Sequence, residues 1–270
     1  MEPGIYTGIT AEDYHAGPGV SCSTLKRFAQ APALALVPQK ESNALKKGTL
    51  RHATVFEPNE VDRLYVVTDL DRAGTNKWKE AEAAAAEAGK ELVKRPEWDD
   101  AHRFAEGIRA NALVRELLEP GDDVVIEQSS YWIDPETGIL CRGRADMFRV
   151  EQQIVVDLKT TERASRREFS VNSARYKYHW QDEWYRTGTQ IAGGWSPAAF
   201  IFIAAEKSAP YLSAVYEIDA ASRARANASL RTHLDRYAEC QRTGIWPGYP
   251  ETLQTLELPF WAEEDGDGAL

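Results

Sequence analysis

The sequence predicts an α/β protein, with a central mixed sheet that contains an antiparallel hairpin and is flanked by helices. Residues 139–161 hold two runs rich in apolar and β-branched residues, and the polar triplet 151–153 between them is typical of a tight turn. Segments with helical periodicity lie on either side of this hairpin in the sequence, at 97–118 and 219–242. No linker or shift in composition divides the chain, so we expect one domain over residues 1–270.

The N-terminal part is expected to be irregular over residues 1–20, where glycine and proline are frequent. A short helix is predicted at 24–31, with Ser21 or Ser23 as its N-cap. A second helix is predicted at 43–56. The start of the first helix could bind a phosphate through its amides and basic side chains. Ordinary capping with a solvated basic face explains the same residues.

The next segment is predicted to alternate between strand and helix. Residues 64–68 have the composition of a strand, and the alanine-, glutamate- and lysine-rich residues 76–88 have high helix propensity with few apolar anchors. We expect this second segment to form an exposed helix that ends at Gly89. A longer helix at 97–118 has apolar residues at helical spacing.

Beyond residue 120 the sequence predicts the sheet. We expect three consecutive antiparallel strands, at 124–133, 139–150 and 154–161, which carry in turn Glu127, Asp146 and the pair Asp157 and Lys159. The remaining predicted elements, in order, are a helix at 172–191, strands at 198–204 and 212–218, a helix at 219–242 capped by Asp219 and stopped by Gly244, an ordered strap at 246–261, and a mobile acidic tail from about 262.

The cysteines and the hydropathy indicate a cytoplasmic protein. Cys22, Cys141 and Cys240 are odd in number and irregularly spaced, which favours reduced thiols over disulfides, a zinc site or an iron–sulfur cluster. The N-terminus lacks the basic and apolar regions of a signal peptide. No apolar run reaches the length of a membrane span.

The formal net charge of −10 argues against a nucleic-acid partner, but the distribution of charge weakens this objection. Six acidic residues and no basic ones lie in the last twenty positions. Basic residues gather instead at 21–51 and at 163–175, directly after the hairpin. Because the local field matters more than the total charge, DNA remains an allowed partner.

The hairpin carries the main candidate site. Asp146 and Asp157 lie near the ends of its two strands, and Lys159 projects from the same face as Asp157 because strand side chains alternate. A carboxylate beside the apolar run 154–156 needs a partner, and a divalent cation is a common one. The alternative is a solvated hairpin in which Asp157 and Lys159 form a surface ion pair of little energetic weight.

Further candidates surround the hairpin. His52 lies beside the apolar stripe of helix 43–56, where a lone histidine is more often structural than functional. Glu127 could join the carboxylates or form hydrogen bonds within the sheet, and we favour the second. Gln181 and Tyr185 share one face of helix 172–191. We expect the many aromatic residues of that helix, from Tyr176 onward, to pack mainly in the core.

This constellation resembles a known nuclease superfamily. Asp146 followed by Asp157-Leu158-Lys159 resembles the PD-(D/E)XK signature, and the added histidine and glutamine–tyrosine helix resemble the branch with RecB-type domains and lambda exonuclease. The similarity is greatest to the RecE (exonuclease VIII) family of C-terminal nuclease domains and covers nearly the whole chain. It rests on ordered blocks that include GTLRHATVFEP, YWIDPETGILCRGRADMF, VVDLKTT, YKYHWQDEWY and WPGYPETLQTLELPFWA.

The resemblance implies both a fold and an activity. The fold is that of PD-(D/E)XK nucleases, with a catalytic antiparallel hairpin. A related protein is expected to be a processive 5′-to-3′ exonuclease that digests linear double-stranded DNA and leaves 3′ single-stranded tails for recombination. The implied cofactor is Mg²⁺, with Mn²⁺ as a substitute. The implied assembly is a ring-shaped homo-oligomer, with a tetramer favoured over a trimer. The implied partner is a RecT-like single-strand annealing protein, often of phage origin.

The resemblance also assigns roles to residues of this chain. The metal ligands would be Asp146, Asp157, the carbonyl of Leu158, and His52, since Mg²⁺ prefers oxygen donors and the imidazole would also favour Mn²⁺. Lys159 would orient the attacking water, with Gln181 and Tyr185 positioning it. The residues expected to contact a 5′-phosphate are Ser23, Lys26 and Arg51. Two alternatives remain: a PD-(D/E)XK endonuclease, and a non-catalytic module that binds DNA ends.

Overall fold

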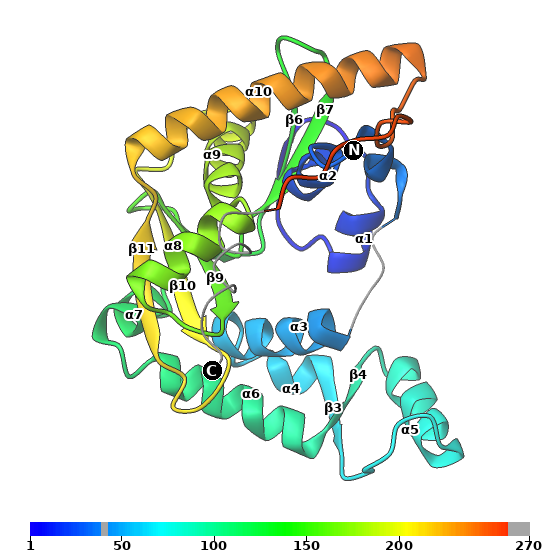
Figure 1. Ribbon diagram of the computed structural model, residues 1–270. Coiled ribbons are helices and arrows are strands. Elements are labelled where there is room, and N and C mark those ends of the chain that lie inside the picture. Colours follow the sequence, from blue (N-terminus) through cyan, green and yellow to red (C-terminus); the bar gives the residue numbers. More distant parts are fainter. Residues whose placement is uncertain (39–42, 259–270) are drawn as a thin grey trace, which may run out of the picture.

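The computed structural model describes residues 1–38 and 43–258, so the expected mobile tail from about residue 262 lies outside the described residues. Two main sheets and a small third one make up the β structure (Figure 1). The strands of the five-stranded sheet, in spatial order, are β11 (Ser213–Glu217), β10 (Ala199–Glu206), β9 (Ile154–Thr161), β8 (Met147–Arg149) and β5 (Val124–Ile126). Those of the four-stranded sheet are β1 (Gly4–Tyr6), β6 (Ser129–Ile133), β7 (Leu140–Arg144) and β2 (Val20–Ser21). The third sheet pairs β3 (Tyr65–Thr68) with β4 (Glu91–Lys94).

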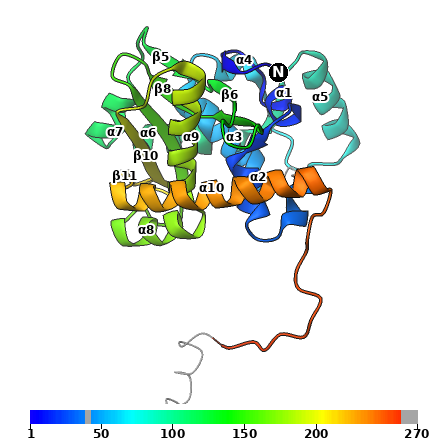
Figure 2. The ribbon, with the colours of Figure 1, turned by 90° about the horizontal axis from the view of Figure 1, so that it is seen from above.

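Helices surround these sheets. Those of the N-terminal half are α1 (Ala11–Ala16), α2 (Cys22–Phe28), a 3₁₀ helix (Pro32–Leu36), α3 (Asn43–Phe56), α4 (Val61–Leu64), α5 (Asn76–Glu87), α6 (Arg95–Ile108) and α7 (Ala112–Leu117). Those that follow the hairpin are α8 (Arg166–Arg175), α9 (Tyr178–Gly193) and α10 (Ala220–Thr243). Viewed from above, α10 runs along one side of the body past both α8 and α2 (Figure 2).

The predicted α/β class with a mixed sheet and an antiparallel hairpin is confirmed. In the five-stranded sheet β8 and β9 pair antiparallel, with Met147 opposite Val156, whereas β9 and β10 run parallel. The run 154–156 is apolar because β9 is an inner strand with neighbours on both edges, and such strands are buried on both faces.

The prediction of three consecutive antiparallel strands in one sheet is wrong. The segments 124–133 and 139–150 each break into two strands that belong to different sheets. Glu127 has a left-handed backbone, with φ of 51°, and its N–H donates to the carbonyl of Asp146 at 2.9 Å. Both segments therefore turn at the same place, and we call this junction between the two sheets, residues 127 and 145–146, the seam.

Two predicted helices are also divided. The helix expected at 97–118 ends at Ile108, and α7 begins anew because the Asn111 side chain accepts hydrogen bonds from the first amides of that helix. The helix expected at 172–191 is replaced by α8 and α9, which meet at Lys177 in a left-handed conformation (φ 54°). The N-terminal twenty residues are not irregular, since they form β1, α1 and the start of β2.

Other predictions are confirmed. The strand expected at 64–68 is β3, and α5 follows closely the predicted exposed helix, with Gly89 in a left-handed conformation just beyond it. Helix α10 is capped by Asp219 and stopped by Gly244, as predicted. Strand β4, which pairs with β3, has no counterpart among the predicted elements.

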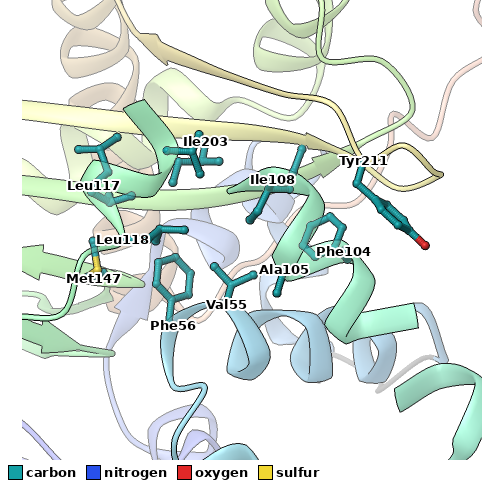
Figure 3. Close-up of a cluster of buried hydrophobic side chains, with 13 residues drawn as sticks. Val55, Phe56, Phe104, Ala105, Ile108, Leu117, Leu118, Met147, Ile203 and Tyr211 are labelled. Atoms are coloured by element: carbon teal, nitrogen blue, oxygen red, sulfur yellow. The ribbon is translucent and has the colours of Figure 1, made fainter. Parts of the chain in front are cut away.

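Buried apolar clusters attach the helices to both sheets. One cluster joins α3, α6 and α7 to the five-stranded sheet, with Phe56, Phe104 and Ile203 among its members (Figure 3). A second joins α2, α9 and α10 to the four-stranded sheet around Trp132 and Trp184. Because burial of apolar area is the main stabilising contribution, these clusters hold the helices that carry the candidate site residues in place.

The strap predicted at 246–261 is confirmed only at its start. Trp246 packs edge-on against Phe28 and Tyr237, and the carbonyl of Pro247 accepts a hydrogen bond from the N–H of Ala33. From Tyr249 to residue 258 the side chains are exposed, and this part of the tail runs away from the body (Figure 2).

The three cysteines are buried and unpaired with one another, in agreement with the expectation of free thiols. Within residues 1–38 and 43–258, no helix combines the length and the apolar character needed to span a membrane. The cytoplasmic location and the single domain over residues 1–270 stay predictions.

Candidate active site

Two carboxylates meet at the β8–β9 hairpin. Asp146 lies at the seam, directly before β8, and its Oδ2 accepts a hydrogen bond from the N–H of Leu158 at 2.8 Å. Asp157 lies in β9, beside Phe202 of the parallel strand β10, and its side chain is fully buried. The hairpin therefore brings the two predicted acids into one region.

Lys159 and Gln181 contact Asp157. The Lys159 ammonium forms an ion pair with Asp157 Oδ2, as expected for side chains two positions apart on one strand. The amide of Gln181, from the first turn of α9, donates to Asp157 Oδ1 at 2.7 Å. The same amide lies 3.4 Å from the hydroxyl of Tyr185, one turn further along α9. The predicted glutamine–tyrosine face of this helix thus faces the acids.

His52 reaches the same region from α3. Its Nε2 lies 3.2 Å from Asp146 Oδ2, and its Nδ1 lies 3.7 Å from Glu127 Oε1. The ring of Phe56, one turn later on α3, packs against the imidazole at 4.5 Å. The structure therefore brings together His52, Asp146, Asp157, Lys159, Gln181 and Tyr185, all named from the sequence as a possible site.

Glu127 is part of the cluster. The prediction that it only forms hydrogen bonds within the sheet is therefore wrong. Its carboxylate lies between His52 and the guanidinium of Arg144, with which it forms an ion pair. Arg144 also donates to the carbonyls of Ile9 and Thr10. No sequence signal distinguished Arg144, because its partners lie in distant parts of the chain.

The electrostatics of the cluster are those of carboxylates crowded in a buried space. Burial, together with the charge of Asp146, raises the pKa of Asp157 to about 6. Burial acts on Asp146 in the same direction, but His52, Lys159 and the Leu158 amide outweigh it and lower the pKa of Asp146. Burial alone would lower the pKa of His52, yet the Asp146 carboxylate outweighs that effect and raises it. Lys159 is likewise held charged, with a raised pKa.

The carboxylate and imidazole groups of the cluster are suitable ligands for a hard divalent cation, although here they form ion pairs and hydrogen bonds with neighbouring side chains. Within the described residues, no group of three or more histidine, cysteine, aspartate or glutamate side chains is arranged as a ready metal shell. Asp157 Oδ2 is nevertheless buried, forms an ion pair with Lys159 and accepts no further hydrogen bond. Two neighbouring carboxylates, one fully buried with a raised pKa and one half-buried, favour a cation between them, and oxygen donors suit Mg²⁺.

The three residues expected to contact a 5′-phosphate do not converge. Lys26 approaches the cluster, with its Nζ 5.7 Å from the ring centre of Tyr178, which also lies 5.1 Å from the Lys159 Nζ. Ser23 is exposed in α2, and the N-cap is Ser21, whose hydroxyl accepts from the N–H of Thr24.

Arg51 points away from the cluster. Its guanidinium pairs with Asp100 at 2.6 Å, donates to the carbonyl of Lys207 at 2.8 Å and lies over the rings of Phe104 and Tyr211. The structure thus engages Arg51 in a contact between α3, α6 and the β10–β11 loop rather than at the acids.

A cavity lies elsewhere in the molecule. It has a volume of about 440 Å³ and lies between α8, α10 and the end of β11, with His179 and Arg225 in its lining. None of the site residues predicted from the sequence lines it. The acid cluster is instead a closed, charged contact between α3, α9 and the hairpin.

Comparison with known proteins agrees with this geometry. The model of one family, described as "PDDEXK-like domain of unknown function (DUF3799)", matches residues 21–259 and so spans every element of the cluster. Among curated proteins, none matches the chain.

A solved structure described as that of a "putative exonuclease" from Eubacterium rectale is similar over 97% of this chain and 100% of that one, with a TM-score of 0.62. The two sequences are 12% identical, so the likeness shows a shared fold. The predicted PD-(D/E)XK fold and superfamily are therefore confirmed, whereas the narrower resemblance to the RecE family stays a prediction.

Proposed function

Because the chain belongs to the family of PDDEXK-like domains, we propose that it is a divalent-metal-dependent nuclease that hydrolyses DNA phosphodiester bonds. The observation that carries this proposal is the meeting of His52, Asp146, Asp157 and Lys159, from a helix and both strands of a hairpin, in one buried cluster. Such a dense group of shifted pKa values is more typical of a reaction site than of a structural ion pair.

Each residue has a task in this proposal. Asp146 and Asp157, with the carbonyl of Leu158 and the His52 imidazole, would hold the cation. A bound divalent ion supplies Lewis-acid stabilisation of the charge that develops on the phosphate. Lys159, charged because two carboxylates raise its pKa, orients the attacking water and the scissile phosphate.

Gln181 restricts the position of Asp157 from the side of α9, and Tyr185 contacts Gln181. The Gln181 amide holds one carboxylate oxygen of Asp157, while Lys159 meets the other. Because both partners are hydrogen-bond donors, they fix the rotamer of a ligand carboxylate before substrate arrives. Burial raises the pKa of the Tyr185 hydroxyl far above its usual value, so this hydroxyl stays neutral, and it accepts a hydrogen bond from the Gln181 amide at 3.4 Å.

The finer proposal is a 5′-to-3′ exonuclease on linear double-stranded DNA that uses Mg²⁺ and leaves 3′ single-stranded tails. Its support is the ordered resemblance of the sequence blocks to the RecE family. We propose on the same ground a ring-shaped homo-oligomer, with a tetramer favoured over a trimer, and a RecT-like annealing protein as partner. Light scattering gives the subunit number directly.

The decisive experiment compares Asp157→Ala and Lys159→Ala with the wild-type chain on linear duplex DNA in Mg²⁺. We expect at least about a 100-fold loss of nucleotide release in each variant. Asp69→Ala, which removes an exposed carboxylate on the loop after β3, is the matched control and keeps full activity. Activity within a few-fold of wild type in folded Asp157→Ala would refute the site.

Two controls separate the alternatives. Covalently closed circular duplex remains intact with an exonuclease but is cut by an endonuclease. Binding of DNA ends that is unaffected by metal, with no nucleotide release in Mg²⁺ or Mn²⁺, would instead identify a non-catalytic end-binding module.

A further inference from the structure

One aromatic side chain beside the candidate site is not part of the core. The sequence favoured core packing for the aromatic residues that begin at Tyr176, but the structure leaves 52% of Tyr176 exposed. This residue directly follows α8, at the point where the chain turns into α9. A large exposed ring at such a junction calls for an explanation other than packing.

Tyr176 lies on a firmly held stack of rings. Its ring is stacked on that of Tyr178, with 5.8 Å between the ring centres and 28° between the planes. Tyr178 is in turn stacked on the fully buried Phe202 of β10, at 5.8 Å and 25°. One side of the Tyr176 ring therefore rests on a rigid support, and the exposed half faces solvent.

This stack is adjacent to the proposed reaction site. The Lys159 Nζ lies 5.1 Å from the ring centre of Tyr178 and 6.0 Å from that of Phe202. Asp157, the partner of Lys159, is near enough to help raise the pKa of the Tyr178 hydroxyl, an effect led by burial. Tyr178 thus lies beside both the exposed ring of Tyr176 and the ammonium of Lys159.

Basic residues flank the exposed ring in the sequence, and another approaches the ring on which it is stacked. Arg175 is exposed directly before it, and Lys26 approaches the Tyr178 ring from α2. Lys177 lies over the Trp180 ring, 4.3 Å from its centre, and has a left-handed backbone, which costs a non-glycine residue about 1 kcal/mol. Strained backbone of this kind is concentrated at functional sites, since a stable fold otherwise removes it.

We propose that Tyr176 is a stacking platform for an unpaired nucleobase of the strand whose phosphate lies at Lys159. Exposed aromatic rings with cations on either side are how proteins bind single-stranded nucleic acid, with bases on the rings and phosphates at the cations. Since a base within a duplex has both faces covered by its neighbours, the ring selects a base released from the helix. This inference rests on the proposed nuclease function and narrows it: the strand enters the site separated from its complement.

The test uses a 5′-phosphorylated single-stranded oligonucleotide with 2-aminopurine as its first base, mixed with the full chain in EDTA. Stacking of that base on a tyrosine quenches its fluorescence. We expect quenching with the wild-type chain and with Tyr176→Phe, which keeps the ring. Tyr176→Ala should lose the quenching and bind about 5- to 100-fold more weakly, the range expected for one stacked base.

Matched controls make the outcome specific. Tyr249→Ala removes a tyrosine that is 71% exposed in the distant tail, and it should bind and quench as the wild type does. With cleavable substrate in Mg²⁺, Tyr176→Ala should raise KM for duplexes with two unpaired 5′ nucleotides. It should leave binding to a relaxed, covalently closed circular duplex, which has no unpaired base, unchanged.

Two results overturn the proposal. One is full quenching and affinity in Tyr176→Ala; the other is an equal loss of affinity for DNA with unpaired bases and for covalently closed circular duplex, which identifies a general backbone contact. Either leaves the nuclease function standing if the wild-type chain releases nucleotides. A wild-type chain without cleavage in Mg²⁺ or Mn²⁺ refutes the nuclease function instead, whatever the fluorescence shows.

Discussion

Two glycines allow α9 to approach the four-stranded sheet next to the candidate site. A Cβ on Gly188 would lie 2.6 Å from the Trp132 ring, and one on Gly143 would lie 2.9 Å from the Tyr185 ring. Both rings are enclosed by other residues, so neither can move aside freely. The absence of two side chains thus sets the depth at which α9 presents Gln181 and Tyr185.

Gly188→Ala should therefore destabilise the protein by about 1–3 kcal/mol, the usual cost of overpacking a core. Gly48→Ala in α3 is the matched control, because nothing lies within 4 Å of its added Cβ. There the same change should stabilise by up to about 1 kcal/mol, since alanine restricts the unfolded chain. Urea unfolding of both variants measures the difference, and equal stabilities would contradict this account of the packing.

Part of the site could be predicted residue by residue from the sequence. Asp146, Asp157 and Lys159 follow from the hairpin pattern alone, because alternation along a strand fixes which side chains share a face. Arg51 and His52 show where this reasoning fails. As neighbours on a helix they point in directions about 100° apart, and the sequence does not say which of them faces the acids.

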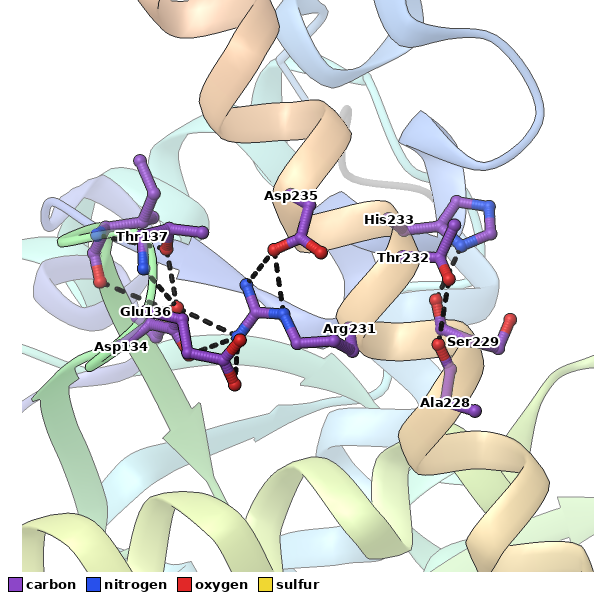
Figure 4. A network of polar contacts seen from close by, with 11 residues as sticks. Asp134, Glu136, Thr137, Ala228, Ser229, Arg231, Thr232, His233 and Asp235 are labelled. Carbon is purple, nitrogen blue, oxygen red and sulfur yellow. Dashed lines mark hydrogen bonds and ion pairs between the residues drawn. The ribbon is translucent and has the colours of Figure 1, made fainter.

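At the level of elements, the turn between β6 and β7 is tied to α10 by a polar network (Figure 4). Asp134 is buried in this turn and accepts hydrogen bonds from the Thr137 N–H at 2.9 Å and the Thr137 hydroxyl at 2.6 Å. Arg231 of α10 lies 2.8 Å from Asp134 and also pairs with Asp235. Burial would raise the pKa of Asp134, but Arg231 and Thr137 outweigh it and lower the pKa.

Asp134→Asn should consequently reduce stability by about 1.5–3 kcal/mol at neutral pH, as expected for hydrogen bonds to a charged group. Because the folded pKa is below the ordinary value of about 3.9, this contribution is present above about pH 4 and is lost as the pH falls further.

The difference in unfolding free energy between the wild type and Asp134→Asn should accordingly narrow between about pH 4 and pH 2. Thermal unfolding across that pH range measures this difference. Asp69→Asn, at an exposed ion pair, should change stability by less than about 1 kcal/mol at every pH. If the stability difference between Asp134→Asn and the wild type stays constant down to pH 2, the Asp134 carboxylate is not the source of that difference.

The sequence predicted whether a segment is a helix or a strand better than it predicted where that element begins and ends. Helical periodicity extends across residues 109–111 and across Lys177 because apolar residues on either side of each break pack against the same sheets. The breaks come from the Asn111 cap and a left-handed lysine. The change from one sheet to the other within 139–150 could not be predicted from the sequence either. Both β7 and β8 read as strand, and they differ only in the distant strands with which they pair.

At the scale of the whole molecule, the charge is divided between the body and the tail. Deleting residues 249–270 removes six carboxylates and no basic residue, which changes the formal net charge from −10 to −4. The residues of this stretch that the structure describes are exposed, so the deletion should leave the melting temperature unchanged. Weaker repulsion should tighten DNA binding about 2- to 10-fold at low salt and have little effect near 1 M salt.

Fluorescence anisotropy with a labelled duplex across a salt series tests this expectation. Replacing Leu253 and Leu256 with serine keeps every carboxylate and should leave affinity unchanged, which separates charge from apolar contact. If the truncated chain binds DNA more weakly at low salt, the tail contacts DNA favourably and the repulsion argument fails.

The seam has a mechanical consequence. Asp146 and Glu127 belong to the joint between two sheets, whereas Asp157 and Lys159 are set in the middle of one of them. A slight rocking of one sheet against the other would act directly on Asp146, whose carboxylate accepts from the Leu158 amide of the neighbouring strand. Substitutions that loosen this hinge line should therefore impair turnover well before they lower the melting temperature.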